Sequence, residues 1–237
     1  MRFVRLAPLL VIAALLGVAC TQQDDAVTQD VVANVPWPDE ERAEYVLLDR
    51  DNREVRGRGV LSVTRHGDQF ALGLRFEGEG DTDESEVIVN AETLKPVSSH
   101  REVSREDTTI DAEYNDAEGI VTITETKEEG ERGVPLRLED HYYDNDSSLF
   151  VWRSVSFAGG YEARYHSVLA ANSRQVVLSL RVVGKEEVVV PAGTFDAWRL
   201  EVRFGEAKQT AWYADTPERP LVQYDNTRSL MQLAALP

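Results

Sequence analysis

The sequence predicts an all-β protein in which mainly antiparallel strands form a curved sheet or open half-barrel. The first indication is a period of two, because apolar and polar side chains alternate over residues 70–77, 109–114 and 176–183. Such alternation is typical of strands with one buried and one solvated face. The second is the short spacing of turn signals such as His66-Gly67-Asp68 and Glu129-Gly130-Glu131. Many short strands with regular turns indicate a meander, a sandwich or an open barrel.

The N-terminus has the layout of a secretory signal peptide, which we assign to residues 1–19. Two arginines precede an apolar run of 14 residues, Leu6–Ala19, and small residues stand directly before Cys20. The run is too short to span a bilayer comfortably, which takes about 20 residues. The segment resembles a bacterial lipoprotein signal, in which the cysteine is acylated and becomes the first residue of the mature chain, although Gly17 stands where leucine is usual. Cys20 is therefore the predicted lipidation site, and an ordinary signal peptide is the alternative.

Two further segments follow the cysteine. Residues 20–36 are polar and acidic with no convincing period, and we interpret them as a flexible tether. A tether of this length has a root-mean-square reach of roughly 20–24 Å, which would hold the body just clear of the lipid. Residues 37–237 contain no internal linker and are predicted to form a single antiparallel β domain.

One short segment, residues 146–154, departs from the strand pattern. Polar residues that favour helix N-termini, Asp144–Ser148, precede Leu149, Phe150 and Trp152 at helical spacing. The sequence therefore predicts a helix of about two turns. Because so short a helix is marginal alone, its apolar stripe is expected to dock on the sheet.

Several stretches resemble a bacterial envelope family, the domain-of-unknown-function family 3108. They are Val182–Leu200, Asp146–Arg153, Ala211–Asp215 with Leu221–Tyr224, and Val89–Pro96. The resemblance implies a periplasmic or surface β-rich module, akin in shape to the LolA-like lipoprotein-carrier half-barrels, and it transfers no catalytic residue. Independently of the family, the stretch around Pro191 predicts a hairpin, because proline fixes φ at the first turn position and Gly193 tolerates a positive φ.

Composition and motifs give little sign of chemistry. The formal net charge of −17 makes a nucleic-acid partner improbable, and one cysteine cannot form an internal disulfide or a cysteine-based zinc site. The four histidines are isolated, and no GxSxG elbow or phosphate loop occurs. We therefore expect a protein that is not an enzyme and needs no cofactor or metal.

Two acidic clusters, Asp81–Glu84 and Asp144–Asp146, are candidates for calcium ligation. Neither has the spacing of a twelve-residue EF-hand loop, and we interpret both as solvated turns. Paired carboxylates for glycoside hydrolysis remain an alternative, since their separation in space is invisible in the sequence.

The predicted shape suggests a binding role. A curved sheet with a helix at its mouth encloses an apolar groove, for which the candidate residues are Leu149, Trp152, Phe157, Trp198 and Trp212. For each of them, simple core packing is the alternative.

We therefore expect a non-enzymatic lipoprotein of the cell envelope, anchored to a membrane by its N-terminal lipid and facing the periplasm or the outside. Its expected ligand is hydrophobic or amphipathic, a lipid or an acyl chain. A structural or interaction module in envelope assembly, with envelope proteins as partners and no small ligand, is the first alternative, and a hydrolase the second.

Overall fold

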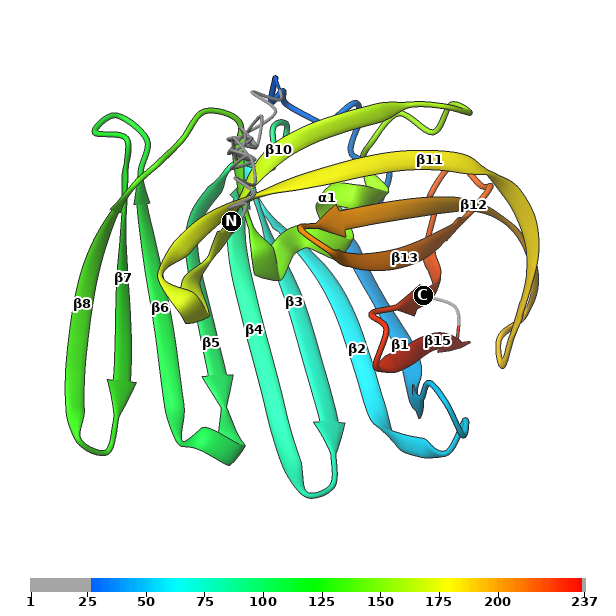
Figure 1. Cartoon of the computed structure of the whole chain (residues 1–237), viewed down its shortest axis with the longest axis horizontal. Helices are drawn as coiled ribbons and strands as arrows, with labels where there is room; N and C mark the ends of the chain where they lie inside the picture. The colour runs from blue at the N-terminus through cyan, green and yellow to red at the C-terminus, as the bar shows by residue number, and fades with distance from the viewer. Residues whose placement is uncertain (1–26, 236–237) are drawn as a thin grey trace, which may run out of the picture.

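A computed structural model describes residues 27–235, which fold around one sheet of 15 strands (Figure 1). Neighbouring strands are antiparallel except for β9 and β10, which are parallel. The spatial order is β8-β7-β6-β5-β4-β3-β2-β1-β15-β14-β13-β12-β11-β10-β9, so the sheet has two free ends and is not closed into a barrel. The predicted all-β, mainly antiparallel class and the open, curved sheet are confirmed.

The first half of the sheet is a meander in chain order. Its strands are β1 Glu40–Asp49, β2 Val55–His66, β3 Gln69–Gly78, β4 Asp81–Asn90, β5 Pro96–Val103, β6 Thr108–Asn115, β7 Ile120–Lys127 and β8 Gly130–Arg137. The second half contains β9 Tyr142–Asp144, β10 Glu162–Leu169, β11 Arg174–Val190, β12 Gly193–Phe204, β13 Ala207–Ala214, β14 Leu221–Asp225 and β15 Ser229–Ala235. Pairing of β1 with β15 joins the halves.

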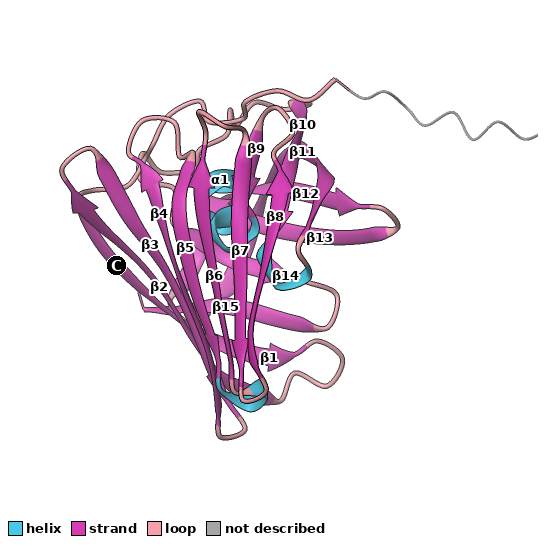
Figure 2. Cartoon of the chain, turned by 90° about the vertical axis from the view of Figure 1, so that its left-hand side faces the viewer, coloured by secondary structure: helices cyan, strands magenta, loops and turns pink. Residues whose placement is uncertain are grey.

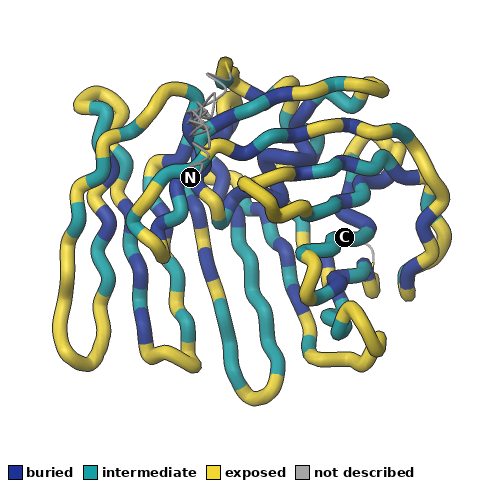
Figure 3. Tube along the Cα trace, viewed as in Figure 1, coloured by how far each residue is buried: buried dark blue, intermediate teal, exposed yellow. Residues whose placement is uncertain are grey.

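The predicted alternation places one row of side chains on the concave face. Leu72 of β3 lies opposite Val63 of β2 and Val87 of β4, and all three are buried. Cross-strand partners share a face, so each such row adds apolar contacts across several strands. Figure 3 shows that buried positions gather where the strands pass the helix, whereas the hairpin ends of β3–β8 at the bottom of the view are exposed.

The predicted helix is present as α1, Ser148–Arg153, and follows a 3₁₀ turn at Asn145–Ser147. Asp144 caps this turn, since its side chain accepts a hydrogen bond from the backbone N–H of Asp146. The helix lies inside the curve of the sheet (Figure 2) and is buried on all sides, not along one stripe as predicted. The reason is that both halves of the sheet wrap around it. Within residues 27–235, no helix is long and apolar enough to cross a membrane.

The hairpin predicted around Pro191 is confirmed. Val190 pairs with Gly193, whose φ is 138°, and Pro191 and Ala192 form the turn between them. A bulge between Val182 and Gly184 bends β11. The bent hairpin returns to the sheet, where the N–H of Ala192 donates to the carbonyl of Leu233 on β15 over 3.0 Å.

Residues 27–36, which the sequence analysis includes in a flexible tether, instead form a strap against the body. The N–H of Gln29 donates to the carbonyl of Arg164 over 2.8 Å, and the N–H of Ala33 to that of Ser154 over 2.9 Å. Val31 is only 1% exposed and belongs to the main core. The tether prediction is therefore wrong for this part, because Val31 is buried and Val32 and Val35 pack against the main core. The predicted signal peptide 1–19, Cys20 and the start of the tether lie outside the described residues.

Candidate functional site

A groove of about 1020 Å³ opens between the two halves of the sheet. We call it the apolar groove, and it is lined by Pro38, Glu40, Glu41, Arg42, Ser62, Val63, Thr64, Phe195, Ala214, Thr216, Glu218 and Pro220. Its volume lies at the upper end of the range usual for small-molecule sites, and such sites combine apolar walls with a few polar groups. The lining has this mixture, since proline, valine, phenylalanine and alanine alternate with hydroxyl and charged side chains.

Strand register brings the walls of the groove together. Glu40 pairs with Thr64 and Arg42 with Ser62, which places these four side chains in adjacent rows on one face of β1 and β2. Phe195 reaches the opposite wall because the β11–β12 hairpin bends back toward β15. The predicted turn motif thus has a further role, since it positions an aromatic side chain of the groove.

A buried ion pair fixes one wall. The Arg153 guanidinium binds Glu41 in a bidentate manner, with Nη1–Oε1 and Nη2–Oε2 distances of 2.6 and 2.9 Å. The two side chains are 5% and 8% exposed. Arg153 also donates from Nε to the carbonyl of Glu218 over 2.8 Å, and its guanidinium lies 5.5 Å from the Trp37 ring centroid. One side chain of α1 therefore holds β1 and the β13–β14 loop together.

The five groove residues expected from the sequence all lie in or against the main core, and none lines the apolar groove. Leu149 and Trp152 are buried in the main core. Phe157 and Trp198 contact each other, with ring centroids 6.1 Å apart, and are partly buried against that core. Trp212 is also partly buried against the main core. Whether any of these residues meets a ligand stays a prediction.

The placement of Trp212 follows from the register of β12 and β13. Tyr213 pairs with Trp198 and donates from its hydroxyl to the carbonyl of Leu149, so this row faces the helix. Trp212 is one residue earlier and therefore points to the other face. There its Nε1 donates to Glu186 over 2.5 Å.

The two acidic clusters meet around one arginine. Arg101 binds Asp83 with an Nη2–Oδ2 distance of 2.7 Å and Asp146 with an Nη1–Oδ1 distance of 3.2 Å. The Tyr114 hydroxyl donates to buried Asp144 over 2.6 Å. The solvated-turn interpretation is therefore wrong for Asp144–Asp146, whose partners come from distant strands. Among the residues described here, no group of three His, Cys, Asp or Glu side chains could hold a metal ion.

Burial changes the acidity of these carboxyls. Loss of solvation, together with the neighbouring carboxylate of Asp144, raises the pKa of Asp146 from 3.8 to about 6, although Arg101 opposes the shift. Burial likewise raises the pKa of Asp144, against the hydrogen bond from Tyr114. The free energy of unfolding therefore depends on pH through these two carboxyls.

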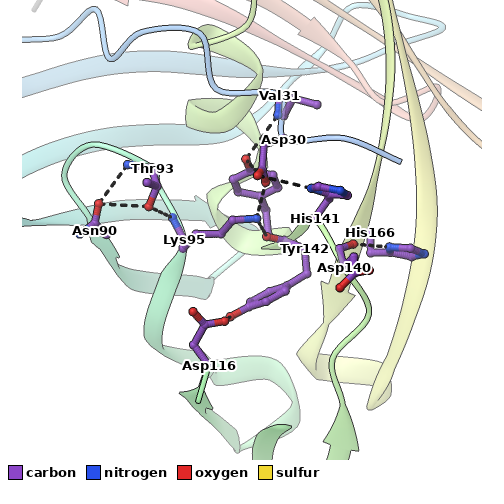
Figure 4. Close-up of polar contacts among 11 residues, drawn as sticks. Asp30, Val31, Asn90, Thr93, Lys95, Asp116, Asp140, His141, Tyr142 and His166 are labelled. Atoms are coloured by element: carbon purple, nitrogen blue, oxygen red, sulfur yellow. Dashed lines mark hydrogen bonds and ion pairs between the residues drawn. The ribbon is translucent and has the colours of Figure 1, made fainter. Parts of the chain in front are cut away.

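A second polar cluster fastens the strap (Figure 4). The Asp30 carboxylate lies 2.5 Å from Nζ of Lys95 and 3.4 Å from Nδ1 of His141, and it accepts from the Tyr143 hydroxyl over 3.2 Å. Lys95 also donates to the carbonyl of Tyr142 over 3.2 Å. Partial burial favours a higher pKa for Asp30, but the Lys95 ammonium and the contact with His141 lower the pKa below its ordinary value. The strap is thus held by charge at Asp30 as well as by the buried side chain that follows it.

Residues 48–227 match the model of a family described as Protein of unknown function (DUF3108). The chain belongs to this family. The resemblance stated from the sequence is therefore confirmed, and the matched region of the DUF3108 protein runs from β1 to the end of β14. Among curated proteins, no sequence matches this chain significantly.

One solved structure shares the fold of this chain at low sequence identity, and a second matches it more weakly. A β-barrel-like protein of domain of unknown function DUF1849 from Brucella abortus has a TM-score of 0.58 at 11% identity, covering 83% of this chain and 96% of its own. A protein from Parabacteroides distasonis, provisionally described as a lipoprotein, has a TM-score of 0.34 at 15% identity, covering 88% and 100%. Only the first score is high enough to indicate a common fold.

Removing one partner of the buried ion pair should be strongly destabilising. Glu41→Ala leaves the Arg153 guanidinium buried without its carboxylate, and we expect a loss of about 3–5 kcal/mol in the free energy of unfolding. Urea unfolding measures it. The matched control is Glu44→Ala on the same strand, whose side chain is 60% exposed and for which we expect a change within about 0.5 kcal/mol. Equal losses in the two variants would contradict the role given to the pair.

The raised pKa of Asp146 predicts a pH-dependent effect of Asp146→Asn. Between pH 3.8 and about 6 the folded state binds more protons at this carboxyl than the unfolded state does. Wild-type stability should therefore fall relative to the variant as pH rises through this window, by on the order of 2–3 kcal/mol. Unfolding at pH 4 and pH 7 measures the difference, with Asp51→Asn at an exposed turn as control. A difference that does not change with pH would refute the assignment.

Proposed function

We propose that the DUF3108 protein is a non-enzymatic lipoprotein of the cell envelope. In this proposal an acylated Cys20 holds it to a membrane, and the apolar groove binds a hydrophobic or amphipathic ligand such as a lipid or an acyl chain. The observation that carries the binding role is the groove itself, with a volume of about 1020 Å³ and a largely apolar lining. The anchor is supported by the basic start, the apolar run and the single cysteine directly after it.

The groove has the polarity expected for an amphipathic ligand. Pro38 and Phe195 offer accessible apolar surface in front of the buried Val63 and Pro220, and each methylene buried against this surface contributes about 0.8 kcal/mol. Arg42 and the hydroxyl of Thr64 lie on the same wall and offer polar contacts to a head group. An alkyl chain of about eight carbons would thus gain roughly 6 kcal/mol before the cost of association, which is enough for measurable binding.

An interaction module without a small ligand is the second candidate, and the end of the sheet favours it. β8 pairs only with β7, and most of its side chains are exposed, so one backbone edge is free within residues 27–235. A free edge can accept a strand from another protein. Pro135 lies on this strand and interrupts its row of donors, which limits such pairing.

A hydrolase is supported least. Asp144, Asp146 and Tyr114 are the acidic and phenolic groups with raised pKa values that lie together. None of the three lines the apolar groove, so a substrate bound in that groove would not contact them. A catalytic pair would have to reach a reacting atom directly. The absence of enzymatic activity stays a prediction.

The anchor is tested by Cys20→Ser. We expect wild-type protein to incorporate an alkyne analogue of palmitate during growth and to fractionate with membranes. The variant should take up no label and should pass into the soluble envelope fraction, because the chain has no second cysteine to acylate. Label that persists in Cys20→Ser would contradict the assignment of Cys20 as the acylated residue.

The groove is tested by filling it. Thr64→Trp places an indole among the lining residues, and we expect the affinity for a fluorescent long-chain fatty acid to fall at least about tenfold. Thr122→Trp is the matched control, since Thr122 is exposed on β7 and lies outside the groove. Fluorescence titration and native mass spectrometry give the result. If wild-type protein binds no fatty acid, or if both variants weaken binding equally, the proposed ligand site is wrong.

A further inference from the structure

Three arginines occupy the outer face of β10, β11 and β12, beside the strap. Arg164 pairs with Ser179, which in turn pairs with Arg203, and Arg181 lies one row away. These side chains line a hollow of about 500 Å³ that also includes Val27 and Gln29 of the strap. We call this surface the arginine face, and it consists of Val27, Arg164, Val177, Ser179, Arg181, Val183 and Arg203.

The arginine face is locally cationic in a protein whose formal net charge is −17. Two acidic side chains in the hollow are neutralised by neighbours, since Glu162 lies 3.4 Å from Arg181 and Glu201 lies 2.7 Å from Lys208. Arg164 and Arg203 form no ion pair with any residue between 27 and 235. Their guanidinium groups are therefore available to an anion, and their forked donors match both phosphate and carboxylate groups.

The same face carries exposed apolar side chains. Val177 and Val183 are 41% and 37% exposed on the outer side of β11, and Val27 is 87% exposed where the strap meets the face. Alternation explains the first two, because Leu178, Leu180 and Val182 point inward and are buried. Arginines interleaved with apolar side chains are typical of surfaces that lie at a membrane interface.

Chain length places this face near the proposed anchor. The N–H of Gln29 is bonded to the carbonyl of Arg164, so the strap joins the body at the arginine face. Only residues 21–26 separate Cys20 from Val27, so the two residues lie at most about 25 Å apart when the chain between them is fully extended. If Cys20 is in the lipid, the arginine face is the part of the body next to it.

We propose that the arginine face lies against the headgroups of an anionic bilayer and orients the protein on the membrane. This inference rests on the proposed lipid anchor at Cys20. The guanidinium groups of Arg164 and Arg203 bind lipid phosphates, and Val27, Val177 and Val183 lie at the headgroup level. The groove between β1 and β13 then has a fixed orientation to the lipid surface.

Asp24 and Asp25 are the competing occupants of the arginine face, since only Ala26 separates them from Val27 in the chain. If they bind Arg164 and Arg203, the two guanidinium groups are not available to lipid phosphates. The experiment therefore includes Asp24→Asn/Asp25→Asn.

The test uses the acylated protein in nanodiscs made of phosphatidylcholine with or without phosphatidylglycerol and carrying a lipid with a quencher on its headgroup. A fluorophore is attached through Ser179→Cys at the centre of the face, and through Thr122→Cys on β7 as the matched control. With phosphatidylglycerol we expect quenching at position 179 to exceed that at position 122 by about threefold or more. Arg164→Glu/Arg203→Glu should remove this excess, whereas Arg58→Glu, whose side chain is 81% exposed on β2, should leave it.

Each outcome decides the inference. Equal quenching at both positions, or an excess that survives charge reversal, overturns the membrane contact. An excess that appears only with Asp24→Asn/Asp25→Asn overturns it in favour of the chain's own acids. Failure of wild-type protein to enter nanodiscs overturns the anchor, and the orientation falls with it.

Discussion

The architecture depends on how a sheet that does not close fills its own concavity. Two edges remain unjoined in a sheet of 15 strands, so the apolar side chains of its concave face need another element to bury them. That element is α1, which has six residues and would not be stable alone. The Arg153–Glu41 pair makes the arrangement specific, because it joins the last residue of the helix to the start of β1 and to the β13–β14 loop. A buried pair of this kind adds little net stability over apolar packing, and its main effect is to exclude other docking positions for the helix.

The features that the sequence predicts correctly are those encoded locally. Period-two alternation, the Pro191–Gly193 turn and the polar cap before Leu149 each depend on residues within a few positions of one another. The features it misses depend on pairing between distant segments. Glu41 and Arg153 are separated by 112 positions, and neither carries a local sign of its partner. The face of Trp212 is set by the register of β12 and β13, and a shift of one residue would reverse it.

The N-terminal strap illustrates how a polar composition conceals a structural role. Its segment is acidic and has no period, which is typical of a tether, yet Val31 is buried and Asp30 is bound by Lys95 and the Tyr143 hydroxyl. Three valines and one charge pair are enough when backbone hydrogen bonds to Arg164 and Ser154 support them, with Val32 and Val35 packing beside Val31. The same reasoning applies to Asp144 and Asp146, whose acidic surroundings in the sequence suggest a turn in water. In both cases the partners that bind these carboxylates lie far away in the sequence, so a local pattern does not reveal them.

The strap also connects the two surfaces to which we assign the proposed ligand binding and the proposed membrane contact. It begins at Val27 on the arginine face and ends beside Trp37, which lies over the Arg153 guanidinium, and the next residue, Pro38, lines the apolar groove. Between these ends the strap is bonded to β10 through Arg164 and to the end of α1 through Ser154. A change in how the strap sits would therefore reach the helix, the buried ion pair and the wall of the groove together. Because the strap is docked from residue 27 onward and follows Cys20 closely in the chain, the proposed anchor would be joined to the groove through a segment that is fixed to the body.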